Sequence, residues 1–545
     1  MNFHSSRFRK RLLWILSGAA LAYSATQAII QWLARAWYVA HAHAYVNDGP
    51  YYWAMGRGIL NGLTLYRDLF DNKPPGIDVL AALSLTFFGN GLLGGLLGSF
   101  LILATPVVVV LWMSRRLIKT SGVLRAMILA LTGFATILFT LYQAERGGAW
   151  QTEFFGAFFG TLFVMLVLDH PPRRTLGWRR MIASGLALGI ACGFKEPFLL
   201  TALACVLLID PHPRCLLRAF LAPTVVATLI GGTVMMFFGW LQPYLAFYLP
   251  AVMGFRIQAF GPLWARGFAQ WRVLRNLFSF SWALPILILF LFAVWLVLSL
   301  RESGRSLRTL GVRIVTAIVA LYLATTAVGM GGDFQSHHFV FAVPFFFTLL
   351  ILFCDAATKQ WHWRFVPWLA AIALVLSAIP FLTLMHPQYS NALAGTAREE
   401  IPVRAAADAL DAVMDRCSID RYLYVEGNHP PLYGYTRHSP LNAAIFWQID
   451  NAIQYGDRFA NLSFQRISQG SILVEPASGF VPTSTIGEEM ATYFGKTFSA
   501  DPPPCAQPLP QTPDYTLFFR VSPERLKLRV TPKGQRPKEL VGSQP

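Results

Sequence analysis

Apolar runs about as long as a membrane span recur through the first 386 residues of the chain, separated by polar segments. A helix needs about 20 apolar residues to cross the hydrocarbon core of a bilayer. The runs 180–194 and 196–210 are short and meet at Lys195, which fits tilted helices, broken helices or a re-entrant segment. The pattern predicts about eleven spans, near residues 12–36, 91–114, 122–142, 150–168, 180–194, 196–210, 216–239, 280–300, 312–329, 338–355 and 365–386.

Two segments between the spans have a different pattern. Pro75–Gly89 is apolar but only roughly 15 residues long, too short to cross comfortably, so we expect an interfacial or half-buried helix. The segment Trp240–Asn276 is rich in aromatic residues and arginines, including Arg256. We expect it to be a long loop that covers a lipid-facing cavity.

Residues 387–545 contain no apolar run of span length and are richer in Pro, Asn, Ser and Asp. Helical and alternating patterns predict a small α/β domain here, long enough to bury its own core. The tail after Leu526 is polar and is predicted to be loose. The expected helices are Arg398–Arg416 and Ile486–Phe494, and the expected strands are Tyr422–Val425, Ile472–Val474 and Tyr515–Val521. The predicted fold is therefore an all-α polytopic membrane bundle (1–386), with interfacial helices in its first outer loop, followed by an α/β domain (387–545).

Composition agrees with a polytopic membrane protein, because 55% of the 545 residues are hydrophobic and mean hydropathy is +0.47. The net charge of +17 comes largely from bases in short loops between apolar runs, and no basic stripe with interleaved aromatics indicates nucleic-acid binding. These basic loops alternate with less basic ones, which predicts a cytoplasmic N-terminus and an outer C-terminal domain. The first apolar run exceeds a typical signal-peptide core and is interpreted as an uncleaved signal anchor.

The chain has six cysteines, of which only Cys417 and Cys505 lie in the C-terminal region. An even pair in a compartment that permits disulfides predicts one bridge, with two free thiols as the alternative.

The stretch Asn47–Gly76 gathers acids and bases in a protein with only 13% charged residues. Asp48 directly follows the first span, where partial desolvation would make its carboxylate a better proton acceptor; it could equally cap the helix that begins at Pro50. Lys73 precedes two prolines and is a point charge suited to a lipid phosphate, although lysines also simply extend to headgroups. The same stretch carries Arg57, Arg67, Asp68 and Asp71.

Further charged candidates lie at the predicted outer ends of later spans. Glu153 is costly beside apolar helices unless it has a partner, such as Arg146 or another outer base, or a function. Lys195 either has a role in binding or pairs with the adjacent Glu196. His337 and His338 suit phosphate contact, proton transfer or interfacial anchoring better than a zinc site, which needs more ligands.

Together these residues place acids and bases on one face of a helical bundle, as transfer of a sugar from a lipid phosphate requires. An acid would deprotonate the acceptor hydroxyl, and bases would neutralise the phosphate leaving group. Two other readings are a transporter or flippase for a lipid-linked glycan, and a polymerase or ligase for such glycans. A transporter favours ionisable residues at mid-membrane and internal repeats, and neither pattern is visible here.

The sequence resembles the GT-C glycosyltransferases, specifically the branch of protein O-mannosyltransferases and lipid A aminoarabinose transferases. The resemblance rests on an acid after the first span, on GxxLYRDxxDxKPPG before a helix ending in Phe88-Gly89, on TEFF at Glu153, and on HHFVFAVP beginning at His337. The chain departs from the family where Asn47-Asp48-Gly49 replaces an Asp-Glu pair and where His338 replaces a tyrosine.

By resemblance, Asp48 is the catalytic base and Glu153 a second acid that orients the acceptor or a metal. Lys73, Lys195, His337 and Arg67 are expected to hold the donor phosphate, whereas Arg57, Asp71, His338 and Arg256 are substrate-binding or structural candidates. The resemblance implies a polyprenyl-phosphate sugar as donor and a glycan, lipid or protein as acceptor. It places the enzyme in the bacterial inner membrane with a periplasmic active site, and a divalent cation is compatible with it.

Overall fold

The protein is described from a computed structural model. The structure describes residues 49–89, 92–121, 150–169, 177–260, 307–329, 336–360, 400–424, 431–441, 467–476, 485–509 and 515–521, together with residues 15, 26, 29, 33 and 465. The predicted spans 122–142, 280–300 and 365–386, and most of 12–36, lie outside these residues.

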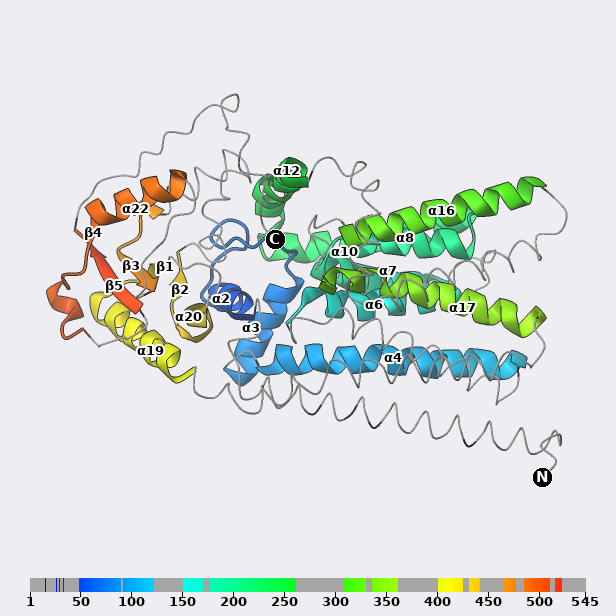
Figure 1. The fold of residues 1–545 in the computed structure, drawn as a ribbon, viewed down its shortest axis with the longest axis horizontal. Coiled ribbons are helices and arrows are strands. Elements are labelled where there is room, and N and C mark those ends of the chain that lie inside the picture. Colours follow the sequence, from blue (N-terminus) through cyan, green and yellow to red (C-terminus); the bar gives the residue numbers. More distant parts are fainter. Residues whose placement is uncertain are drawn as a thin grey trace.

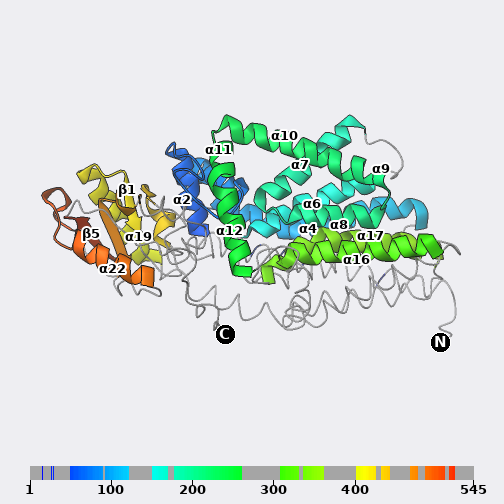
Figure 2. The same cartoon turned by 90° about the horizontal axis from the view of Figure 1, so that it is seen from above.

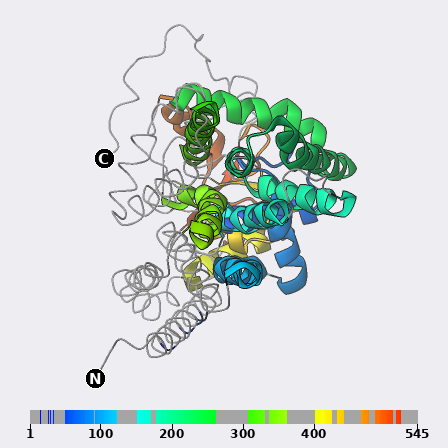
Figure 3. The same cartoon turned by 90° about the vertical axis from the view of Figure 1, so that its right-hand side faces the viewer.

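Long apolar helices run side by side through one end of the molecule, and the sheet domain forms the other end (Figure 1). Figure 3 looks along this bundle, so that its long helices are seen end-on. Three stretches of the described chain are long and apolar enough to cross a membrane: Leu93–Met113, Pro213–Phe237 and Gly311–Gly329. The helices are α4 (Leu92–Ser121), α6 (Thr152–Leu168), α7 (Trp178–Phe194), α8 (Phe198–Ile209), α9 (Pro213–Leu216), a π-helical turn (Leu217–Leu221), α10 (Ala222–Phe237), α16 (Leu307–Gly329) and α17 (Val343–Gln360).

Helix α6 is packed tightly among its neighbours because two glycines lie one turn apart on it. A Cβ added at Gly156 would collide with the ring of Phe198 on α8, and one at Gly160 would lie 3.0 Å from Pro344 on α17. Small residues spaced four apart allow this close approach of helices in membranes. The first turn of α6, which contains Glu153, is thereby fixed against α8 and α17.

Two helices lie between the bundle and the sheet domain: α2 (Gly49–Leu60) and α3 (Gly76–Phe88). Helix α3 closely matches the predicted interfacial segment and ends at Gly89, whose φ of +67° favours glycine. At its start, a Cβ on Gly76 would lie 2.6 Å from the carbonyl oxygen of Gly193. The segment that carries Lys73 therefore leads directly into a contact with the end of α7.

The C-terminal region forms a five-stranded sheet with helices beside it (Figure 1). The strand order is β2-β1-β3-β5-β4; β1 pairs in parallel with β2 and β3, and the remaining pairs are antiparallel. The predicted elements of this region recur, most with small shifts of their ends. The elements are α19 (Glu400–Cys417), β1 (Arg421–Tyr424), α20 (Pro431–Tyr435), β2 (Ser439–Pro440), β3 (Ile472–Pro476), α22 (Thr485–Thr497), β4 (Phe498–Ser499), a 3-10 turn (Pro504–Ala506) and β5 (Tyr515–Arg520).

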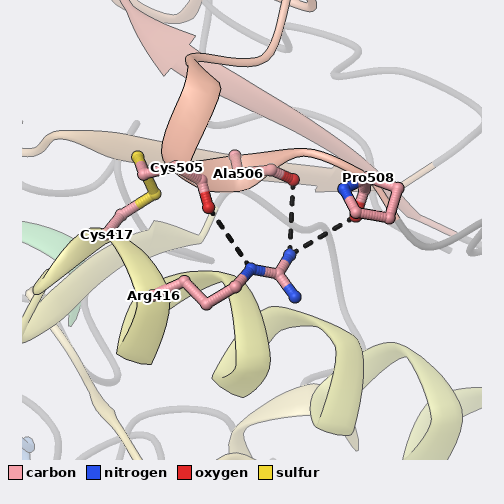
Figure 4. The surroundings of a disulfide bond; sticks show 5 residues. All are labelled: Arg416, Cys417, Cys505, Ala506 and Pro508. Carbon is pink, nitrogen blue, oxygen red and sulfur yellow. Dashed lines mark hydrogen bonds between the residues drawn. A yellow bond between two sulfur atoms is a disulfide. The ribbon is translucent and has the colours of Figure 1, made fainter.

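A disulfide joins Cys417, at the end of α19, to Cys505, the pair expected from the sequence (Figure 4). Beside it, the guanidinium of Arg416 donates hydrogen bonds to the carbonyl oxygens of Cys505, Ala506 and Pro508. The bridge and these bonds hold the segment after β4 against α19.

Helix α2 joins the sheet domain to the rest of the molecule (Figure 2). Its Tyr51 and Ala54 belong to the same buried apolar cluster as α19 and the sheet. The Arg57 guanidinium donates to the carbonyl oxygen of Gly434 at 3.3 Å, and Arg421 of β1 donates to the carbonyl oxygen of Asp68 at 2.9 Å. The segment from α2 to Asp68 is therefore held against the sheet domain by two hydrogen bonds.

The segment Trp240–Asn276, expected to be a loop, is helical in its described part. It forms α11 (Leu241–Pro243), a π-helical turn (Tyr244–Tyr248) and α12 (Leu249–Phe260). Tyr248 is fully buried in a cluster with Tyr66 and Leu69 of the first outer loop. Burial of this aromatic face explains why a short helical segment is stable where the sequence suggested a surface loop.

Candidate functional site

Glu153 lies in the first turn of α6, and only 1% of the residue is exposed. The hydroxyl of Thr152 donates to its carboxylate at 3.0 Å, and Lys195 Nζ lies 3.7 Å from Oε1. A buried carboxylate needs such a partner because desolvation of an isolated charge is costly. The sequence suggested Arg146 or another base as the partner of Glu153. Arg146 lies outside the described residues, and Lys195 is the base that lies beside the carboxylate.

Lys195 lies between α7 and the turn that leads into α8, and its own backbone is extended. Its φ and ψ are −162° and 126°, and Pro197 follows at the start of α8. The chain turns at Glu196 and Pro197. Glu196 does not share the partner of Lys195, and its Oε1 accepts a hydrogen bond from the hydroxyl of Tyr248 at 2.6 Å.

Tyr248 also connects this break to the first outer loop, since its hydroxyl lies 3.4 Å from the carbonyl oxygen of Asn72. The next residue is Lys73, whose carbonyl oxygen accepts a bond from the hydroxyl of Tyr66 at 3.0 Å. Lys73 Nζ lies 4.6 Å from the ring centroid of Tyr52, a cation–π contact. The buried Tyr248 thus bridges the carbonyl oxygen of Asn72, which precedes Lys73, and the carboxylate of Glu196, which follows Lys195.

His337 and His338 come from the 3-10 segment Ser336–Ala342, which precedes α17. The ring of His338 stacks on Phe341, and the carbonyl oxygen of Phe341 accepts a bond from Thr201 of α8 at 2.9 Å. Both histidines offer a ring nitrogen that lies within 4.8 Å of the carboxylate of Glu153 and of each other. Three segments distant in sequence therefore meet at Glu153.

Carboxylate and imidazole groups are ordinary ligands of a divalent cation, so Glu153, His337 and His338 fit a metal by type. Tetrahedral zinc with bonds of about 2.0–2.1 Å would require these atoms to draw closer together. The ammonium of Lys195 lies 3.7 Å from Oε1 and supplies a positive charge beside the carboxylate.

A second group of buried acids, Asp71 and Asp78, lies near Lys73. The sequence singled out only Asp71. Asp71 is 5% exposed, and Asp78 of α3 is fully buried. Within the described residues neither carboxylate oxygen of Asp78 has a hydrogen-bond partner. Burial raises the pKa of Asp78 well above its ordinary value, the neighbouring Asp71 raises it further, and Lys73 opposes both. No sequence pattern marked Asp78, because an acid in the first turn of a helix is commonplace.

We expect Asp78→Asn to stabilise the protein at neutral pH by about 1–3 kcal/mol. The folded protein keeps the Asp78 proton to a higher pH than the unfolded chain, so wild-type stability falls as pH rises from 3.8 toward the raised pKa. Melting temperatures in detergent at pH 4 and pH 8 test this: the variant should gain over wild type only at the higher pH. Asp408→Asn, at an exposed acid of α19, is the control. Equal gains at both pH values would contradict the assignment.

The remaining candidates have different surroundings. Arg67 is 60% exposed at its side chain and is paired with Asp68 at 2.7 Å. Arg57, a substrate-binding or structural candidate, donates a hydrogen bond to the sheet domain, which is a structural contact. Burial lowers the pKa of its guanidinium. Arg256 lies in α12, and its side chain is not among those that the structure describes. Asp48 also lies outside the described residues, but Gly49 follows it, and a Cβ there would lie 3.4 Å from the ring of Trp150, close in sequence to Glu153.

Comparison with known proteins gives structural similarity only. No family model and no curated protein matches the sequence. The structure is similar to ArnT from Cupriavidus metallidurans, solved bound to undecaprenyl phosphate, at 13% identity and a TM-score of 0.42, over 92% of this chain and 98% of that one. It is also similar to the Archaeoglobus fulgidus oligosaccharyltransferase, solved with Zn and sulfate, at 12% identity and a TM-score of 0.41, over 86% of this chain and 69% of that one.

Proposed function

We propose that the protein is an integral membrane glycosyltransferase that moves a sugar from a polyprenyl-phosphate donor to an acceptor hydroxyl, with inversion at the anomeric carbon. The observation that carries the proposal is the convergence of Glu153, Lys195, His337 and His338 from three separate segments, next to the loop of Lys73. Buried ionisable groups are costly in a membrane protein, and they mark functional sites.

In the proposed reaction the acceptor oxygen attacks the anomeric carbon as the bond from that carbon to the phosphate oxygen breaks. The electron pair of the broken bond leaves with the phosphate, and the hydroxyl proton passes to Asp48. The donor is a phosphodiester with one negative charge, whereas the product is a phosphomonoester that can carry two. Cationic groups therefore stabilise the product side of the reaction more than the ground state.

Lys73, Lys195 and His337 are proposed to supply that positive charge. Tyr248 bridges Asn72, next to Lys73, and Glu196, next to Lys195, and Lys195 and His337 both lie near the Glu153 carboxylate. Glu153 would hold the two cationic groups in place and orient the acceptor. In this arrangement a lipid phosphate has several donors within one small volume, which favours its binding over that of a neutral headgroup.

The acceptor is proposed to approach from the outer aqueous side, between Asp48 and the sheet domain. Helix α2 begins one residue after Asp48 and packs against α20 of that domain, with Gly434 lying against Trp53. This contact supports the proposal that the sheet domain forms one wall of the acceptor path, on the periplasmic side of a bacterial inner membrane. A glycan, a lipid-linked saccharide or a protein could be accepted there.

The test uses purified full-length protein in liposomes with radiolabelled polyprenyl-phosphate pentoses and hexoses. We expect label transfer with stoichiometric release of free polyprenyl phosphate. Asp48→Asn should lower transfer by about 10²–10⁴-fold, the usual contribution of a general base, with donor binding retained. Asp68→Asn, an acid of the same loop, is the control. Unchanged transfer by Asp48→Asn would refute the role of the base, and movement of the intact donor across the bilayer without its consumption would identify a transporter.

A further inference from the structure

An open crevice of about 660 Å³ lies between α4, α6 and α7. This volume is within the range of about 300–1,000 Å³ that ligand pockets occupy. Its walls are almost entirely apolar and include Trp112, Phe159, Ala183 and Leu186. Asp169 lies at the mouth of the crevice and caps the C-terminal end of α6. Glu153 lies in the first turn of the same helix, so the two residues are about 24 Å apart at a rise of 1.5 Å per residue. The crevice is therefore separate from the proposed catalytic site.

Two opposite charges lie at the mouth of the crevice. Arg115 of α4 and Asp169 both line it and both are exposed. In the part of the chain that the structure describes, no ion pair joins these two side chains. The neighbouring Arg116 is engaged elsewhere, since its guanidinium donates to the carbonyl oxygen of Leu168 and to Asp355, each at 2.8 Å. At the same rim the exposed Arg180 of α7 donates to the backbone carbonyl oxygen of Asp169 at 3.3 Å, so the Asp169 carboxylate lies beside a backbone-bound arginine and is not ion-paired with Arg115.

We infer that the crevice binds a zwitterionic aminophospholipid. An apolar crevice on membrane-embedded helices is covered by acyl chains, because water has no hydrogen-bond partners along such walls. The lipid phosphate would contact Arg115, and its primary ammonium would contact Asp169. An anionic phospholipid could also face Arg115 and Arg180, but it has no ammonium to place against the Asp169 carboxylate. The two rim charges therefore select for the aminophospholipid.

Native mass spectrometry of the full chain tests the proposal by counting the lipids that stay bound. The protein is purified in mild detergent and supplied with equal amounts of phosphatidylethanolamine and phosphatidylglycerol. Arg115→Gln should reduce retained phospholipid about fivefold, the value of roughly 1 kcal/mol per basic contact to a lipid surface. Asp169→Asn should keep the total but lower the ratio of phosphatidylethanolamine to phosphatidylglycerol to near one. Ala183→Phe, which fills the crevice, should release both lipids.

Leu229→Phe and Arg179→Gln are matched controls, because both residues are exposed and neither lines the crevice. Both should retain lipid as the wild type does, and melting temperatures identify any variant that fails to fold. Lipid retention that is unaffected by Ala183→Phe would overturn the site. A lipid ratio unaffected by Asp169→Asn, or an Arg115-dependent polyprenyl lipid in place of phospholipid, would overturn the choice of ligand.

Discussion

Glu153→Gln is expected to reduce sugar transfer by about 10²-fold or more while leaving the bilayer insertion of the protein intact. The substitution preserves the shape of the side chain but removes the negative charge that faces Lys195 and the two histidines. Lys195 would then be a largely buried ammonium without its counter-charge, a change that costs about 3–5 kcal/mol when one partner of a buried pair is removed. Transfer of labelled sugar and melting temperature should therefore both fall.

The double variant Glu153→Gln/Lys195→Gln separates chemistry from stability. If the pair acts only as a structural ion pair, removing both charges should restore the melting temperature and most of the activity. If Glu153 and Lys195 contact the substrate, as proposed, stability should recover while transfer remains low. Arg116→Gln/Asp355→Gln, at a half-exposed pair 2.8 Å apart near the other end of the bundle, is the control for a pair without a catalytic role. Recovered activity in the first double variant would assign Glu153 a purely structural role.

The larger elements could be predicted from the sequence because their signals are local. An apolar run with a glycine after it predicted the helix Gly76–Phe88 almost to its ends. Alternating residues likewise predicted the strands β3 and β5. The helix within Trp240–Asn276 could not be predicted from local signals, because it is stabilised by aromatic contacts with Tyr66 and Phe70, residues far away in sequence.

The candidate site could be predicted as a set of residues but not as a set of pairs. Sequence proximity suggested that Lys195 pairs with Glu196, whereas the structure places Lys195 beside Glu153 and Glu196 beside Tyr248. Tyr248 itself gave no signal, since a tyrosine in an aromatic segment resembles an interfacial anchor. Asp78 was missed for a related reason, because its significance is its complete burial, a property of packing alone.

Lys73→Gln is expected to weaken binding of polyprenyl phosphate about 10–100-fold. A hydrogen bond to a charged group contributes about 1.5–3 kcal/mol, and about 1.4 kcal/mol corresponds to a factor of ten. Lys73 is suited to this role because its position is fixed from several sides. Its carbonyl oxygen accepts a hydrogen bond from Tyr66, its ammonium lies over the ring of Tyr52, and the ring of the following Pro74 restricts its backbone. Scintillation proximity binding of labelled undecaprenyl phosphate to the purified variant measures the change.

Arg67→Gln provides the matched comparison, because both residues were predicted to hold the donor phosphate and both lie in the same outer loop. Arg67 is exposed and already paired with Asp68, and exposed pairs contribute only about 0–1 kcal/mol. A phosphate that binds in the buried cluster should therefore depend on Lys73 and change less than about fivefold with Arg67. The reverse order of effects would move the phosphate to the exposed face of the loop, away from Glu153, and would leave the buried cluster without a substrate to act on.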